Sequence, residues 1–144
     1  MFVGNKKTYP KVSINNLWIS FLISDKQRKL DNLLSLEKVK ILFSAELIEE
    51  ITRSAKHPKL KEYFNKEAVE EMFTSLEPYI DFIEVKSVVN ICRDSKDNFL
   101  LALSKDGNAN FLLTGDKDLL VLFKIGKTKI ITISQFFDEI RHFS

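Results

Sequence analysis

Short apolar runs that alternate with amphipathic stretches are the feature that most constrains the fold of this chain. Each run has the length and composition of a strand, and the stretches between them carry apolar residues at helical spacing. The expected strands cover residues 12–15, 39–43, 82–85, 110–114 and 129–133. Strands that alternate with helices predict a three-layer α/β/α sandwich around a mostly parallel sheet of about five strands.

Start and stop signals place the helices between these strands. Ser44 is a good N-cap for a helix that ends before Pro58, because the residue before a proline disfavours helix. Asp97 is expected to begin a helix that Gly107 closes, and Ser134 is expected to cap the terminal helix. The other expected helices cover residues 17–22, 25–36, 59–64, 66–79 and 118–123.

The composition is that of a single globular domain. A chain of 144 residues with 44% hydrophobic residues can bury a sizeable core, and we expect one domain over residues 10–144 after a loosely ordered segment 1–9. The net charge of +2 gives no bulk attraction to nucleic acid, so a local basic patch would have to supply it. One cysteine, Cys92, excludes an internal disulfide. Without a signal peptide or membrane-spanning stretch, we expect a soluble, cytoplasmic protein.

Two acidic blocks lie where α/β proteins bind ligands. Asp97 is expected at a helix start with Asp94 just before it, and Asp116 follows an apolar strand with Asp118 just after it. The carboxyl ends of parallel strands meet at one edge of the sheet, so these carboxylates are expected to gather and to require neutralisation by Mg²⁺ or Mn²⁺. Helix capping is the simpler explanation of each aspartate taken alone.

A third acidic candidate lies on the helix that follows Ser44. Helical geometry places Glu50 beside the apolar stripe of this helix and Glu49 on the far side, so Glu50 is the inward candidate. A solvated helix face explains the same glutamates without any ligand.

Three segments of the chain resemble the PIN-domain family, and in particular its toxin components of toxin-antitoxin systems. They are SAELIEEI (44–51), RDSKDNFLLAL (93–103) and LTGDKDLL (113–120), within a likeness that runs from about Val12 to the terminal helix. The resemblance implies a PIN-like fold and a Mg²⁺- or Mn²⁺-dependent ribonuclease that hydrolyses RNA phosphodiesters. It also implies RNA, a cognate antitoxin protein and a second copy of the chain as partners.

The resemblance assigns roles to individual residues. Glu50, Asp97 and Asp116 occupy the family's catalytic metal-site positions, and Asp118 lies nearby as a further ligand. Asn16 corresponds to an asparagine that orders the site, although a capping role explains it equally well.

One expected ligand is missing from the first strand. The family's strand ends Asp-Thr-Asn, whereas this one ends Ser13-Ile14-Asn15-Asn16. One alignment puts Ile14 at the aspartate position, and a shift by one residue puts Asn15 there. Either alignment removes a carboxylate, since isoleucine has no donor atom and asparagine offers only a neutral carbonyl oxygen. We therefore expect hydrolysis to be weakened or lost, and a non-catalytic RNA- or protein-binding module is the alternative.

Basic residues near the acids are candidates for binding RNA phosphates. Arg93 and Lys96 flank the acidic block, and Lys56 and Lys59 belong to a basic run that also contains Tyr63. A solvated helix face explains the second run as well. A phosphotransfer domain is disfavoured because the first strand lacks the acidic residues that such a domain would need.

Overall fold

The computed structural model describes residues 10–14, 39–55, 74 and 77–140. The expected helices at 17–22, 25–36 and 59–64, most of the one at 66–79 and the expected loose segment 1–9 lie outside these ranges. None of the described helices combines the length and the apolarity needed to cross a membrane.

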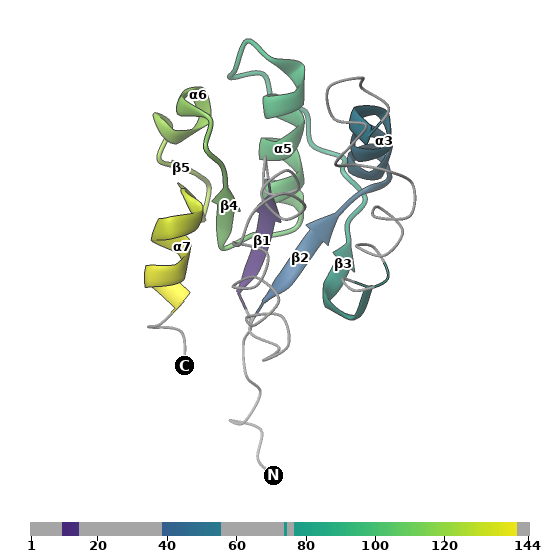
Figure 1. The fold of residues 1–144 in the computed structure, drawn as a ribbon. Helices are drawn as coiled ribbons and strands as arrows, with labels where there is room; N and C mark the ends of the chain where they lie inside the picture. Colours follow the sequence, from purple (N-terminus) through teal and green to yellow (C-terminus); the bar gives the residue numbers. More distant parts are fainter. Residues whose placement is uncertain (1–9, 15–38, 56–73, 75–76, 141–144) are drawn as a thin grey trace.

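A mostly parallel sheet lies at the centre of the described fold (Figure 1). Its spatial order is β3-β2-β1-β4-β6-β5, and every neighbouring pair is parallel except β5 with β6. The strands are β1 (Lys11–Ile14), β2 (Lys40–Phe43), β3 (Ile80–Phe82), β4 (Phe111–Leu113), β5 (Lys124–Ile125) and β6 (Thr128–Ile131). The described residues thus confirm the predicted mostly parallel sheet and add one strand to the expected five, but the third strand ends at Phe82, where the expected strand 82–85 was to begin.

The additional strand, β5, forms a hairpin with β6. Ile125 pairs with Thr128, and Gly126 between them has a φ of 56°, a left-handed conformation that glycine adopts without steric cost. A strand of two residues is too short to show a two-residue repeat in the sequence, which is why the sequence pattern did not predict it.

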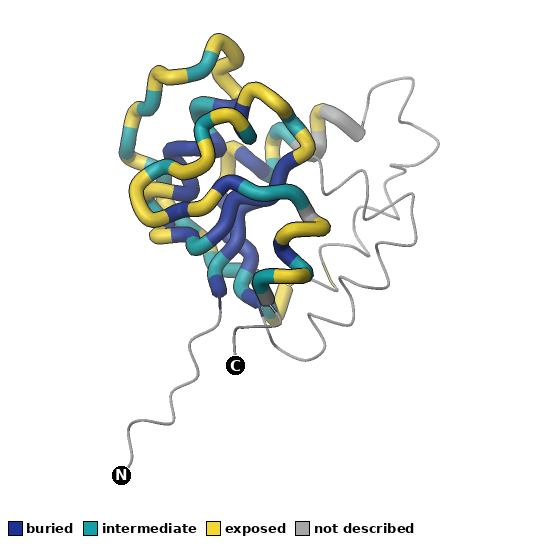
Figure 2. The backbone as a smooth tube through the Cα atoms, turned by 90° about the vertical axis from the view of Figure 1, so that its left-hand side faces the viewer, coloured by how far each residue is buried: buried dark blue, intermediate teal, exposed yellow. Residues whose placement is uncertain are grey.

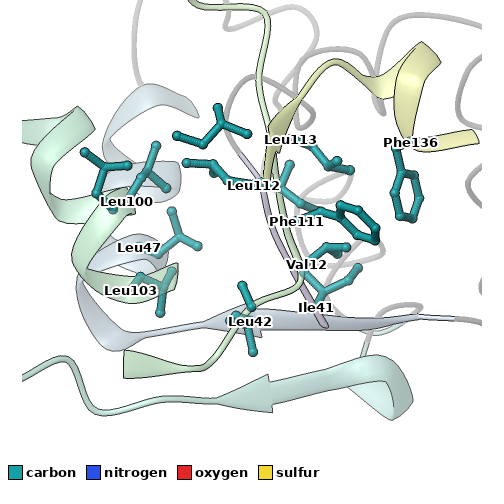
Figure 3. Packing of buried hydrophobic residues seen from close by; sticks show 14 of the residues in the cluster. Val12, Ile41, Leu42, Leu47, Leu100, Leu103, Phe111, Leu112, Leu113 and Phe136 are labelled. Carbon is teal, nitrogen blue, oxygen red and sulfur yellow. The ribbon is translucent and has the colours of Figure 1, made fainter. Parts of the chain in front are cut away.

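Helices cover both faces of the sheet, as the α/β/α prediction requires. They are α3 (Ala45–Ala55), α5 (Ser95–Asp106), α6 (Lys117–Leu120) and α7 (Ile133–Ile140), with a 3-10 turn at Glu77–Tyr79. Figure 3 shows Leu47 of α3 and Leu100 of α5 on one side of the strands, and Phe136 of α7 on the other. All three side chains belong to the buried core.

Alternation along the strands assigns side chains to these two faces. Phe111 points to the α7 side, where its ring meets that of Phe136 edge-on at 5.7 Å, and Leu112 points to the α5 side (Figure 3). Ser13 is in register with Leu112 and shares its face, since its hydroxyl group is hydrogen-bonded to that of Ser104 in α5 at 2.9 Å. This register decides which residues of β1 can reach the functional site.

Helix starts confirm one predicted cap and correct another. The Ser44 hydroxyl accepts a hydrogen bond from the Leu47 amide at 3.1 Å, so Ser44 caps α3 as expected. Ser134 is not the cap of α7, because that helix begins one residue earlier. The Gln135 amide instead donates to the Thr132 hydroxyl at 3.2 Å, and the Thr132 amide donates to the Gln135 side chain at 2.9 Å, a capping box that the sequence analysis missed.

Gly107 closes α5 as predicted, and close packing around it leaves no room for a side chain. A Cβ atom there would lie 2.5 Å from Leu42 Cδ1, 3.1 Å from the Leu103 carbonyl oxygen and 3.2 Å from Ile83 Cγ1. Because Leu42 is fully buried and cannot move aside freely, we expect Gly107→Ala to lower the free energy of unfolding by about 1–3 kcal/mol in urea titrations. Gly115→Ala is the matched control, since a Cβ there meets nothing within 4 Å; an equal loss in both variants would contradict the packing argument.

Candidate functional site

Asp97 lies in the first turn of α5 but does not cap it. The prediction that Asp97 begins the helix is wrong: α5 begins at Ser95, and Asp94 is the N-cap, whose carboxylate accepts from the Lys96 amide at 2.9 Å. Asp97 is only 5% exposed, although aspartate is rarely buried unless it is paired. Capping therefore accounts for Asp94 and leaves the burial of Asp97 unexplained.

Asp116 reaches the same place from the end of β4. Its amide donates to the Thr114 hydroxyl at 2.9 Å, and its carboxylate caps α6 by accepting from the Asp118 amide at 2.9 Å. The same carboxyl group lies close enough to that of Asp97 for a hydrogen bond between them to raise the pKa of Asp97. The sequence prediction that the two acidic blocks meet at one edge of the sheet thus agrees with the geometry.

The surroundings of Asp97 disfavour the ionisation of its carboxyl group. Burial raises the pKa of Asp97 to about 6, and the negative charges of Asp116, Asp94 and Asp118 and the hydrogen bond to Asp116 act in the same direction. At neutral pH, Asp97 is ionised at a free-energy cost, and this cost falls if a cation enters or a proton is retained. The pair therefore has the electrostatics of a cation-binding site.

The loop that precedes α5 is fixed beside this pair. The Asn98 side chain accepts from the Ile91 and Cys92 amides at 3.0 and 2.8 Å, and it donates to the Cys92 carbonyl at 2.8 Å. Burial raises the pKa of the Cys92 thiol, and the negative charges of Asp97 and the three other aspartates raise it further. Cys92 is accordingly a protonated, half-buried thiol that borders the acids.

Glu50 lies at the margin of the site. Its carboxylate is 4.0 Å from the Lys96 ammonium group, so α3 approaches the first turn of α5. Glu50 does not join Asp97 and Asp116 in a cluster: among the described residues, no group of three or more His, Cys, Asp or Glu side chains could hold a metal ion. The described part of the site is a pair of carboxylates.

Ile14 does not face this pair. It is in register with Leu113, on the α7 side of the sheet, one residue beyond Ser13, which faces α5. Its side chain is 3% exposed and belongs to the hydrophobic core. Of the two alignments that the sequence left open, the one that assigns the missing aspartate to Ile14 would direct a carboxylate into the core.

The remaining predicted site residues are either exposed or lie outside the described part of the chain. Arg93, Lys96 and Asp118 are exposed, and of these Asp118 lies near enough for its charge to raise the pKa of Asp97. The predicted roles of Asn16, Lys56 and Lys59 concern residues that lie outside the described ranges. The sequence analysis missed the roles of Thr114, which accepts from the Asp116 amide, and of Asn98, which holds the loop before α5, because no spacing rule signals these hydrogen bonds.

Comparison with known proteins identifies the family. A family model described as "PIN domain" matches residues 15–118, which is well over half of the chain and includes Glu50, Asp97 and Asp116. Searches of curated proteins and of solved structures find no match. The sheet with helices on both faces, the acid pair at the strand ends and this match lead to one conclusion: the chain belongs to the PIN-domain family, which is nuclease-like.

Proposed function

We propose that this protein is a toxin-type PIN domain, derived from a metal-dependent endoribonuclease, whose ability to hydrolyse RNA phosphodiesters is weakened or lost. The observation that carries the proposal is the close approach of two carboxyl groups, that of the buried Asp97 and that of the half-buried Asp116. Repulsion between adjacent carboxylates destabilises the folded state. Proteins retain such destabilising pairs most often at sites that bind a ligand.

The carboxylate pair fits a loosely held divalent ion. PIN domains generally use Mg²⁺ or Mn²⁺, and Mg²⁺ typically keeps several waters while binding one or two carboxylates and substrate phosphate. Asp97 and Asp116 would hold the ion, and Glu50 and Asp118 remain further candidate ligands. A bound ion would supply charge neutralisation and an activated water for attack on a phosphodiester.

The chain's own residues would position the RNA and the acids. Arg93 and Lys96 are exposed and flank Asp94, the N-cap of the helix that carries Asp97, and we propose that they bind phosphate oxygens. Among the described residues, Lys96 is paired with Glu50, and no ion pair involves Arg93. Asn98 keeps the loop at Ile91 and Cys92 in place and thereby fixes the approach to Asp97.

The weakening follows from the first strand. Neither Ile14, which packs in the core, nor the neutral Asn15 and Asn16 can replace a carboxylate, so the site has one negative charge fewer than the family pattern. For the same reason, the second candidate function is a non-catalytic module that binds RNA or protein. PIN domains commonly bind RNA and antitoxins, and we propose an antitoxin and a second copy of the chain as partners of one domain over residues 10–144.

Thermal unfolding in Mn²⁺ tests the metal site. If the ion binds with a Kd near 1 mM, about 10 mM Mn²⁺ stabilises the fold by about 1.4 kcal/mol and raises Tm by about 3–5 °C. Asp116→Asn should abolish this shift, because it removes one of the two paired carboxylates. Asp138→Asn, which changes an exposed carboxylate on α7, is the matched control and should leave the shift intact.

The outcome of this titration separates the two candidate functions. If Mn²⁺ does not raise the Tm of the unmodified protein, the non-catalytic module is favoured. Robust hydrolysis of RNA by the unmodified protein, if it were lost in Glu50→Gln, would show that the site is complete and that the proposed weakening is wrong.

A further inference from the structure

Phe123 combines an unfavourable backbone conformation with an exposed ring. Its φ is 62°, in the left-handed region that bulky side chains rarely adopt. Hydrogen bonds hold it there: its amide donates to the Leu120 carbonyl at 3.2 Å, and its carbonyl accepts from the Ile130 amide at 2.8 Å. The position follows a helix, where glycine is the usual residue in this conformation.

Packing does not explain why phenylalanine occupies this position. The Phe123 side chain is 76% exposed, and nearby Val121 is exposed as well. Within the described residues, the phenyl rings of Phe111 and Phe136 meet edge-on in the core, whereas no ring contact involves Phe123. A strained residue that leaves most of its surface exposed points to a role in binding.

The charge around Phe123 indicates what is bound. The segment 117–129 contains four lysines and a single acid, Asp118. Lys117, Lys124 and Lys127 are exposed, and among the described residues only Lys129 of the four is in an ion pair, with Glu139 at 3.7 Å. An exposed aromatic ring among lysines matches a polyanion whose units carry flat aromatic faces.

This surface lies on the segment that follows Asp116 along the chain. Asp116 caps α6, and Phe123 follows that helix by three residues, so one short segment connects the acids to the ring. Figure 1 shows α6 and β5 together at one edge of the sheet, and Figure 2 views the molecule from that edge, with exposed segments around the buried strands. A strand of RNA bound at the acids could extend across this edge.

We propose that Phe123, with Lys124 and Lys127, forms a base-stacking platform for single-stranded RNA. The lysines bind the phosphates, and the phenyl ring stacks on an unpaired base without reading its identity. The inference rests on the proposed function, since it assigns RNA to the same site, but it requires neither a metal ion nor cleavage.

Binding without metal tests the platform directly. We would measure fluorescence anisotropy of a labelled oligouridylate of about 12 nucleotides in EDTA. Phe123→Leu keeps an apolar side chain but loses the stacking face, and we expect about 5- to 100-fold weaker binding. Phe82→Leu is the matched control: Phe82 is 64% exposed at the opposite edge of the sheet, and its replacement should leave RNA binding unchanged.

Two further measurements separate stacking from a structural role. Phe123→Gly relieves the left-handed strain, so Tm should rise by about 3 °C while RNA binding falls; a structural role would lower both. An abasic oligonucleotide of the same length keeps the phosphates but lacks the bases. It should therefore bind the unmodified protein and the Phe123 variants equally.

The outcomes also distinguish this inference from the proposed function. If the unmodified protein binds RNA and Phe123→Leu binds it equally well, the platform is wrong, the RNA function stands, and the exposed ring belongs to a protein interface. If the unmodified protein binds no RNA in EDTA and none with Mn²⁺, both are wrong. If Phe123→Leu binds RNA more weakly and the unmodified protein cleaves no RNA, the platform is supported and the protein is a non-catalytic RNA-binding module.

Discussion

Ile14→Asp is expected to lower the free energy of unfolding by about 4 kcal/mol, a large part of the about 5–15 kcal/mol that is ordinary for a folded domain. The residue packs against the core on the α7 side of the sheet, where no described cation faces it, so the new carboxylate would be buried without a partner. Urea titration followed by circular dichroism measures the loss. Ile14→Asn introduces a neutral side chain with the shape of aspartate. It therefore separates the cost of the buried charge from the cost of lost packing.

Asn15→Asp is the informative counterpart of this variant. Residue 15 lies outside the described ranges, but it is the other position at which the sequence alignment can place the missing aspartate, and the burial of Ile14 in the core disfavours the first. We therefore expect Asn15→Asp to remain folded and to bind Mn²⁺ at least 10-fold more tightly than the unmodified protein. If Ile14→Asp were stable and bound Mn²⁺ more tightly, the assignment of Ile14 to the α7 side of the sheet would be wrong.

Asp97→Asn is expected to raise the free energy of unfolding at neutral pH by up to about 3 kcal/mol. The folded-state pKa of Asp97, about 6, lies above its ordinary value of 3.8, so the folded protein binds this proton more tightly than the unfolded chain. The contribution of Asp97 to stability is therefore fully present below about pH 4 and is lost as the pH rises through about 6. Urea titrations at several pH values should show a gap between the two proteins that widens from pH 4 to 7.

Asp106 provides a control with the opposite sign. It accepts hydrogen bonds from the Ser87 hydroxyl and from the Ser87 and Lys86 amides, and these bonds, led by that of the Ser87 side chain, lower its pKa. Its stabilising contribution is present at neutral pH and is lost as the pH falls through the lowered pKa. Asp106→Asn should therefore be less stable than the unmodified protein at neutral pH. If Asp97→Asn also lost stability there, Asp97 would be stabilised by its surroundings and the electrostatic argument would fail.

A trade-off between stability and function follows from these expectations. The substitution that stabilises the fold at Asp97 should also remove metal binding, because the same repulsion that destabilises the pair attracts the cation. Mn²⁺ and Asp97→Asn relieve the same repulsion, so their stabilising effects should not be additive. A variant that carries Asp97→Asn should gain no further Tm in Mn²⁺.

Much of the architecture was determined by the sequence alone. The alternation of apolar runs and amphipathic stretches predicted the mostly parallel sheet, and Ser44 and Gly107 marked helix ends correctly. The meeting of Asp97 and Asp116 also followed, since the carboxyl ends of parallel strands lie at one edge. These features depend on local hydrogen bonding and on side-chain periodicity, which neighbouring residues encode.

Only the tertiary structure decided which side chains contact one another. A shift of one residue along a strand reverses its faces, so the sequence could not tell whether Ile14 or Asn15 belongs to the site; the register of β1 with β4 excludes Ile14. The exposure of Phe123 and the contact of Glu50 with Lys96 likewise depend on how separate elements pack. The physical reason is that local patterns fix an element's type, whereas its orientation is set by burial against partners distant in the chain.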